Sequence, residues 1–140
     1  MTSPRARFRQ KENLRMLNSN SLSIAFPKLK SLKVELSFFQ PGGQHQSGQI
    51  KYAVNLEHAK AVFRFDCLNK ECVRGDFDLT EALAAAIASK EKVAIGELCC
   101  HGWRNKDVIR KIQCRNVLRY KLHLEYSPKR TANGNGSSQL

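Results

Sequence analysis

Hydrophobic and polar residues alternate along several stretches of the chain, as they do in strands that bury one face. The alternation is strongest over residues 32–38, 50–56 and 118–126. Shorter alternating stretches cover residues 61–65 and 93–99. Together these patterns predict an antiparallel sheet of about five strands, in which the first three strands follow one another as a meander.

One main helix is predicted between the third and fourth of these strands. Asp78 is expected to be its N-cap, and Glu81 stands three positions later, as in a capping box. The polar run 89–92 is expected to end the helix. The hydrophobic residues of one helical face are Leu79, Leu83, Ala86 and Ile87. A single helix among antiparallel strands indicates an α+β fold.

Composition divides the chain into three parts. Residues 1–20 are rich in Arg, Lys, Gln and Asn and predict a flexible basic arm. Residues 21–127 predict one α+β domain, and a weak alternation over 22–26, ended by Pro27, predicts a short first strand. Residues 128–140 form a polar tail of Asn, Gly and Ser that is predicted to be disordered.

The cysteines are the strongest chemical signal in the sequence. Cys67 and Cys72 are separated by four residues on a short polar stretch, an arrangement that supplies half of a tetrahedral zinc site. Cys100 and Cys114 are predicted to supply the other half. The domain is therefore expected to be stapled by a structural Zn²⁺ ion, which four thiolates hold without leaving a position open for catalysis.

The third ligand position has two candidates, Cys99 and Cys100. Neighbouring residues of a strand point to opposite faces, so only one of the two sulfurs can face the metal. We favour Cys100 because Gly102, two positions later, allows a tight turn that brings backbone N–H groups toward the sulfur. Cys99 is then expected to be a small buried hydrophobe. His101 is a weaker substitute ligand.

Other interpretations of the cysteines remain open. They can be buried and unreactive, form a disulfide, or provide a reactive thiol, with Cys99 or Cys72 as the nucleophile. No partner base is visible near either thiol, so the sequence favours a binding protein over an enzyme. Within the cysteine loop, Asn69 and Gly75 are the residues expected to accept positive φ angles.

The net charge of +12 is concentrated at the two ends of the chain. Residues 1–33 hold eight Lys and Arg against Glu12, and residues 104–140 hold nine against two acidic residues, whereas residues 34–103 are slightly acidic. This distribution predicts an anionic partner, either nucleic acid or an acidic protein surface, although basic tails can also serve solubility alone. The predicted phosphate contacts are Arg5, Arg7, Arg9, Arg115, Arg119 and Lys121.

Targeting signals are not evident. No apolar run approaches the roughly 20 residues of a membrane span, and the first thirty residues lack the apolar segment of a secretory signal. We therefore expect a cytoplasmic protein that does not bind membranes. A reducing compartment favours metal binding over disulfides for clustered cysteines.

The cysteine pattern, Cys-x4-Cys from Cys67, Cys-x-Gly-Trp from Cys100 and then Cys114, resembles that of a group of small uncharacterised bacterial proteins. The resemblance covers about residues 26–126 and implies no activity. The chain also resembles zinc-ribbon proteins in its use of cysteine knuckles, but it departs from them in the four-residue spacing and in the long helix between pairs. Nucleic-acid binding by ribbons therefore carries over by analogy only.

The sequence leaves two principal functions in competition. The first is a zinc-stapled module that binds nucleic acid or a ribonucleoprotein through its basic ends. The second is an adaptor that docks on an acidic protein partner, and the same charges would serve it. Trp103, beside the expected ligand Cys100, can stack on a base or shield the metal loop, and packing is the preferred interpretation.

Overall fold

The computed structural model describes residues 3–69, 72–104 and 112–128. Three helices and nine strands are assigned within these ranges. In chain order they are α1 (Pro4–Leu17), α2 (Leu22–Ala25), β1 (Leu29–Phe39), β2 (Gln46–Ala53), β3 (Arg64–Asp66), β4 (Cys72–Val73), β5 (Asp76–Asp78), α3 (Thr80–Ala88), β6 (Val93–Cys99), β7 (Trp103–Arg104), β8 (Ile112–Gln113) and β9 (Val117–Tyr126).

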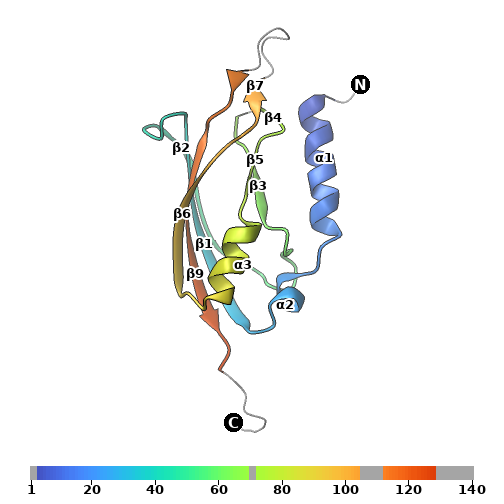
Figure 1. Ribbon diagram of the computed structural model, residues 1–140, viewed down its shortest axis with the longest axis vertical. Helices are drawn as coiled ribbons and strands as arrows, with labels where there is room; N and C mark the ends of the chain where they lie inside the picture. The colour runs from blue at the N-terminus through green and yellow to red at the C-terminus, as the bar shows by residue number, and fades with distance from the viewer. Residues whose placement is uncertain (1–2, 70–71, 105–111, 129–140) are drawn as a thin grey trace.

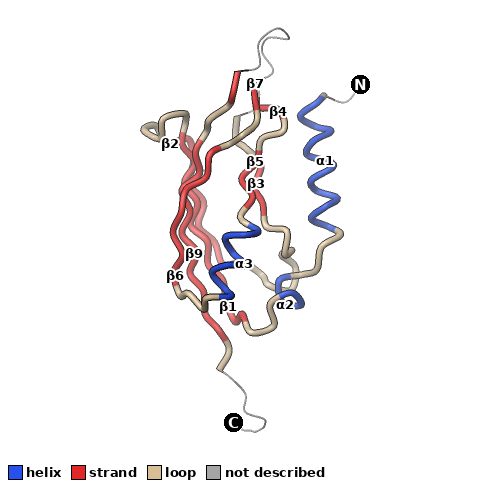
Figure 2. Tube along the Cα trace, in the orientation of Figure 1, coloured by secondary structure: helices blue, strands red, loops and turns tan. Residues whose placement is uncertain are grey.

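The elements are arranged in three layers, as Figures 1 and 2 show. An antiparallel sheet in the order β2-β1-β9-β6 forms the first layer. The helix α3 and the β3–β5 pair lie against one face of this sheet, and α1 runs along the far side of that middle layer. A small sheet in the order β4-β7-β8 closes one end of the molecule.

The two central strands of the main sheet follow the predicted alternation. In β1 the buried residues are Leu32, Val34, Leu36 and Phe38. In β9 they include Leu118, Leu122 and Leu124, while the basic residues between them face outward. Leu36 pairs with Tyr120 in the register of these strands, so both apolar faces point toward the middle layer. The α+β architecture predicted from the alternation is confirmed.

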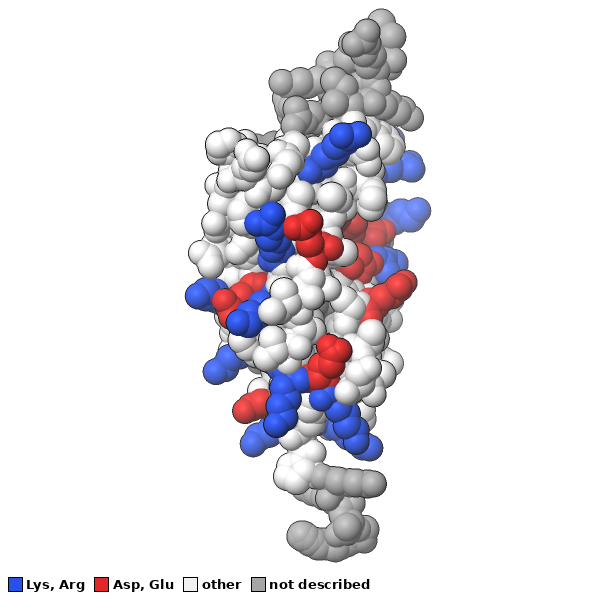
Figure 3. Space-filling model, turned by 60° about the vertical axis from the view of Figure 1, so that its left-hand side comes forward, with Lys and Arg blue, Asp and Glu red and all other residues white. Residues whose placement is uncertain are grey.

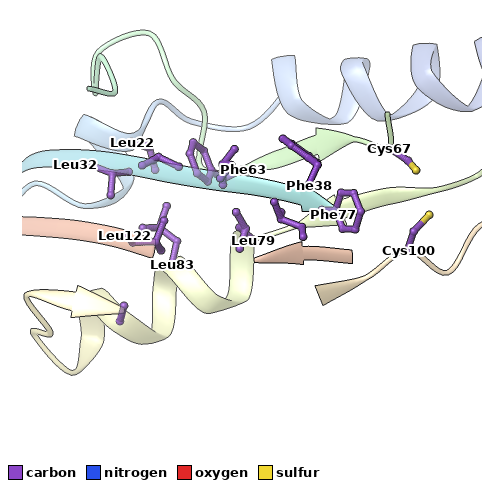
Figure 4. Packing of buried hydrophobic residues seen from close by; sticks show 14 of the residues in the cluster. Leu22, Leu32, Phe38, Phe63, Cys67, Phe77, Leu79, Leu83, Cys100 and Leu122 are labelled. Atoms are coloured by element: carbon purple, nitrogen blue, oxygen red, sulfur yellow. The ribbon is translucent and has the colours of Figure 1, made fainter. Parts of the chain in front are cut away.

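The core fills the space between the main sheet and the middle layer. Phe38 of β1 contacts Phe77 of β5, with ring centroids 5.9 Å apart. Leu79 and Leu83 enter from α3 and its N-terminus, and both are fully buried. Figure 4 shows this cluster, with the sulfurs of Cys67 and Cys100 near its end. Each fully buried leucine contributes about 1.5–3 kcal/mol by leaving water, so α3 is held firmly against the sheet.

The prediction of a three-strand meander is wrong in its last strand. The main sheet has four strands, because β3 pairs with β5 across the cysteine loop and does not join β2. Alternation identifies a strand but not the sheet to which it belongs, and here the local hairpin supplies the partner. Ile50 and Tyr52 of β2, expected to be buried, are 45% and 39% exposed because β2 is an edge strand.

The N-terminal part of the chain also differs from the prediction of a flexible arm over residues 1–20. Residues 4–17 form α1, and Pro4 lies in its first turn. Ser3 is the N-cap, and its Oγ accepts a hydrogen bond from the Ala6 backbone nitrogen at 3.1 Å. No residue of α1 is buried, so the helix shows none of the hydrophobic periodicity that would have predicted it.

Two further predictions concern the ends of the domain. The short strand expected over residues 22–26 is the single turn α2. The tail predicted over residues 128–140 lies outside the described residues except for Pro128.

The predicted capping of α3 is displaced by one residue. The helix starts at Thr80 with Leu79 at the N-cap, and the capping box with Glu81 is not formed. Asp78 nevertheless accepts a hydrogen bond from the Thr80 backbone nitrogen at 2.9 Å, so its carboxylate still serves an N–H group of the first turn.

Gly96 of β6 lies close to a side chain of the neighbouring strand β9. Its cross-strand partner is Tyr120, and a methyl group at Gly96 would overlap the tyrosine ring.

Candidate metal centre

Four cysteine sulfurs converge at the end of the core. The Sγ atoms of Cys67, Cys72, Cys100 and Cys114 all lie within 4.8 Å of one another, and all four residues are buried. Each follows or begins a strand: Cys67 follows β3, Cys72 begins β4, Cys100 follows β6, and Cys114 follows β8. The sulfurs that the sequence predicted to meet do meet, in a cluster that can hold a metal ion.

The distances between the sulfurs fit metal binding better than disulfides. The Sγ atoms of Cys67 and Cys114 are 3.6 Å apart, and those of Cys72 and Cys100 are 3.4 Å apart. A disulfide would need about 2.05 Å, and all these cysteines are free. In a tetrahedron with Zn–S bonds of about 2.3 Å, the sulfurs are about 3.8 Å apart. The cluster therefore needs only small shifts to enclose an ion.

Two glycines let the backbone pass close to the sulfurs. A methyl group at Gly75 would overlap the sulfurs of both Cys72 and Cys100. A methyl group at Gly102 would lie 2.6 Å from the Cys72 sulfur and 2.6 Å from the Val73 carbonyl oxygen. Both positions therefore require glycine because side chains would displace the cysteine cluster.

The sequence predicted that Asn69 and Gly75 take positive φ angles in the cysteine loop, and this prediction is wrong. Neither Asn69 nor Gly75 has a positive φ angle, and among the described residues near this loop Arg74 is left-handed, with φ of 58°. A second left-handed residue, Arg115, directly follows Cys114, with φ of 60°. Short polar sequences indicate that a turn is present but not which residue takes the left-handed conformation.

Hydrogen-bond donors surround the sulfurs. The backbone N–H of Gly102 donates to the Cys100 sulfur at 3.4 Å, as the Gly two positions after Cys100 suggested. Side-chain amides donate to two others: Asn69 to Cys114 at 3.6 Å and Asn116 to Cys67 at 3.7 Å. Such donors stabilise thiolates and orient metal ligands, and the two asparagines were not identified as sulfur donors from the sequence.

The thiols of Cys67, Cys72 and Cys100 differ in the direction of their pKa shifts when no cation is bound. Hydrogen bonds from the Cys100 and Cys72 thiols hold the pKa of Cys67 far below its usual range. The pKa of Cys72 is raised by its hydrogen bonds with Cys100 and Cys67 and by burial. The pKa of Cys100 is raised as well, mainly by its interaction with Cys67. One thiolate is thus stabilised by neighbouring thiols, and a cation would be needed to stabilise the others as thiolates.

The choice between the two adjacent cysteines is resolved by the geometry. Cys100 belongs to the cluster, and Cys99 lies on β6 with an exposed side chain. The expectation that Cys99 would be a buried hydrophobe is wrong, because its side chain points to the open outer face of the sheet. His101 is exposed and outside the cluster. Among the described residues, no side-chain hydrogen bond connects Cys99 to a base.

Arg5 reaches the cysteine loop from α1. Its Nη1 donates to the carbonyl oxygens of Asn69 at 2.6 Å and Cys72 at 3.1 Å. Its Nη2 donates to the carbonyl oxygen of Cys67 at 3.0 Å. The sequence predicted Arg5 as a phosphate contact, but the structure uses its guanidinium inside the molecule, beside two of the four cysteines.

Two other predicted phosphate contacts are also engaged within the molecule. Arg9 forms an ion pair with Asp66 at 3.1 Å. Arg119 pairs with Glu97 at 2.8 Å and lies over the ring of Phe39.

Three predicted phosphate contacts remain, namely Arg7, Arg115 and Lys121. Arg7 and Arg115 are exposed and have no ion pair among the described residues. Lys121 is half-buried on the outer face of the main sheet. Figure 3 shows acidic and basic side chains interspersed over one side of the molecule, without a continuous basic patch.

Trp103 belongs to β7, which pairs with the strand that begins at Cys72. In β7 it pairs with Val73 on one side and Gln113 on the other, and its side chain is half-buried. The guanidinium of Arg74 lies 5.9 Å from its ring centroid. The packing role expected for Trp103 is therefore compatible with a cation–π contact between its half-buried ring and Arg74.

Comparisons with other proteins leave the site to be interpreted from its own geometry. No protein-family model, curated protein or solved structure matches the chain. Within the described ranges, no helix combines the length and apolar character needed to cross a membrane.

Proposed function

We propose that the protein is a small module stapled by one structural Zn²⁺ ion, and that it binds nucleic acid or a ribonucleoprotein through basic residues around the metal. The observation that carries the proposal is the convergence of four buried sulfurs within 4.8 Å of one another. Around them, the exposed Arg74 follows Cys72 by two positions and the exposed Arg115 directly follows Cys114.

The donor set favours zinc. Four thiolates are soft ligands, and a tetrahedral set of four sulfurs is typical of Zn²⁺ or of iron. Cys67, Cys72, Cys100 and Cys114 would occupy every position of a tetrahedral ion, which favours a structural role over a catalytic one. The ion would link the start of β4 with the residues that follow β3, β6 and β8.

The binding role rests on charge near the metal. Arg7, Arg74 and Arg115 are exposed cations without an ion pair among the described residues, and Arg7 lies two positions after Arg5, which contacts the cysteine loop. The segment 101–116 adds further charge by sequence, with five Lys and Arg against one acidic residue. Phosphate contacts of this kind are independent of base sequence and sensitive to salt.

A thiol-protection assay tests the zinc staple. Native protein is treated with an alkylating reagent, and the modified cysteines are identified by mass spectrometry. We expect rapid modification of Cys99 alone, because the other four thiols are buried and bound to metal. After chelation all five should react. Equal protection with and without chelator would argue for buried, metal-free cysteines.

Fluorescence anisotropy with labelled single-stranded RNA and duplex DNA tests the binding role. We expect affinity at low salt that falls steeply as salt rises. Arg74→Ala with Arg115→Ala should lower the slope of log K against log[salt] by about two, one for each lost phosphate contact. Lys30→Ala with Lys92→Ala removes the same charge at the opposite end of the sheet and is the matched control.

The outcomes separate the two binding classes. If neither nucleic acid binds at low salt, the nucleic-acid proposal is lost. An acidic protein that then binds wild type but not the Arg74→Ala, Arg115→Ala variant would show that the same surface serves an adaptor. If the control pair weakens binding as much as the arginine pair does, the metal end is not the binding surface.

A further inference from the structure

The helix α1 is held to the rest of the molecule almost entirely by polar contacts. None of its residues is buried, and the hydrophobic core starts at Leu22, beyond the helix. The half-buried face of α1 includes Arg5, Phe8, Glu12 and Met16, at helical spacings of three and four. A helix attached in this way can separate from the domain without opening the core.

Arg64 of β3 forms one of the two attachments. Its side chain is 1% exposed and lies under three successive turns of α1. The guanidinium is 5.8 Å from the ring centroid of Phe8, 3.9 Å from Glu12, and 4.0 Å from the sulfur of Met16. These distances are long, so this attachment contributes contact area more than strong hydrogen bonds.

Arg5 forms the second attachment, and it is the stronger one. Its guanidinium donates to three backbone carbonyl oxygens of the cysteine loop at 2.6–3.1 Å. Hydrogen bonds from a charged donor are about twice as strong as neutral ones. The other ion pairs of the helix, from Arg9 and Arg15, are exposed and therefore weak.

The acceptors of Arg5 depend on the cysteine cluster. Two of its three carbonyls belong to Cys67 and Cys72, whose sulfurs are in the cluster. The third belongs to Asn69, whose side-chain amide donates to the Cys114 sulfur. Cys67 and Cys72 therefore place their sulfurs in the cluster and their carbonyl oxygens on one guanidinium, so a shift of their backbone would disturb both sets of contacts.

We propose that α1 is a metal-dependent docked helix: an ion bound by the cysteine cluster would fix the backbone of Cys67, Asn69 and Cys72, and Arg5 then holds the helix against their carbonyl oxygens. Loss of the metal would free this backbone and release α1 with its arginines. The coupling is reciprocal, so docking of α1 also raises the affinity of the cluster for the metal. This inference rests on the metal centre of the proposed function and not on its nucleic-acid partner.

Hydrogen–deuterium exchange of the full-length, zinc-loaded chain tests this coupling. We expect Arg5→Ala to raise the exchange rate of α1 amides by about tenfold or more, a typical size for coupled sites. Peptides from β1 and β9 should keep their protection, because α1 contributes nothing to their core. Arg5→Lys should lie between wild type and Arg5→Ala, since an ammonium cannot serve three carbonyls in a plane as a guanidinium does.

Arg7→Ala is the matched control, because Arg7 is on the same helix and exposed. Zinc affinity is measured on the same samples by equilibrium competition with a coloured chelator and should be weaker by a similar factor in Arg5→Ala than in Arg7→Ala. If the zinc content is one per chain and the two variants behave alike, the coupling is wrong. If wild type holds no metal, the proposed metal centre fails instead.

Discussion

The Sγ atoms of Cys67 and Cys114 lie 3.6 Å apart, although 47 positions separate the two residues in the chain. Cys67 follows β3 of the middle layer, and Cys114 precedes β9 of the main sheet. A metal ion bound between them would therefore join the two layers at the end where the hydrophobic core stops.

Replacement of Gly75 by alanine should disrupt the metal centre. The added methyl group would overlap the sulfurs of Cys72 and Cys100, which have no room to move in a buried cluster. We expect Gly75→Ala to lose bound zinc and to destabilise the fold by about 1–3 kcal/mol or more, as overpacked cores do. Metal analysis and thermal unfolding measure both effects.

Gly48→Ala is the control for that variant. Its methyl group would approach the exposed Leu68 side chain at 3.2 Å, and Leu68 is free to shift. Gly48→Ala should therefore keep its zinc and its melting temperature. If Gly75→Ala also keeps both, the sulfurs are not held where the cluster places them.

Removal of the Arg64 side chain should destabilise the middle layer. Its guanidinium pairs with Asp66 at 2.7 Å and with Asp76 at 2.6 Å, and its side chain is 1% exposed. Arg64→Ala removes the cation shared by these two carboxylates and leaves Asp66 with only the exposed Arg9 as a described partner. We expect a loss of about 2–3 kcal/mol, below the range for fully buried pairs because both aspartates remain partly exposed.

Chemical unfolding of the zinc-loaded protein measures the cost of Arg64→Ala. Asp66→Asn combined with Asp76→Asn in the same background should recover part of the loss, because it removes the repulsion that the first change creates. No recovery in the triple variant would mean that Arg64 acts through packing against α1 and not through these carboxylates.

Asp78 should stabilise α3 across the whole neutral pH range. Burial raises the pKa of Asp78, but hydrogen bonds from Thr80 and Arg15 outweigh it, and the pKa is lowered overall. A lowered folded-state pKa contributes stability above the unfolded-state pKa of about 3.9 and loses it only as the pH falls through the folded-state value.

Asp78→Ala tests this account of the helix start. We expect a loss of about 0.5–1 kcal/mol, at the low end for caps because the side chain is 38% exposed. The difference from wild type in urea unfolding should stay constant between pH 8 and pH 5. A difference that shrinks already at pH 6 would contradict the lowered pKa.

The predictions from sequence succeeded where a residue pattern has one usual structural meaning, as alternation and clustered cysteines do. Alternation located β1 and β9, because each buries a single face against the core. The four clustered cysteines were identified by spacing, and the choice of Cys100 over Cys99 followed from a turn at Gly102 that the structure contains.

The failures have a common physical cause, which is contacts that leave no periodic pattern in the sequence. The helix α1 was missed because polar contacts made by Arg5 and Arg64 hold it in place, and polar contacts leave no hydrophobic period. The pairing of β3 with β5 was missed because alternation does not identify a partner strand. Gly75 was noticed as a turn residue, whereas close approach of two sulfurs is what requires it.

The most direct test of the metal centre is the zinc content of two variants that differ by one position, Cys99→Ser and Cys100→Ser. The two serines change adjacent residues identically, but only Cys100 belongs to the cluster. We predict about one zinc per chain in wild type and in Cys99→Ser, and loss of zinc together with cooperative unfolding in Cys100→Ser. Metal-free wild type whose melting curve matches that of Cys100→Ser would contradict the account.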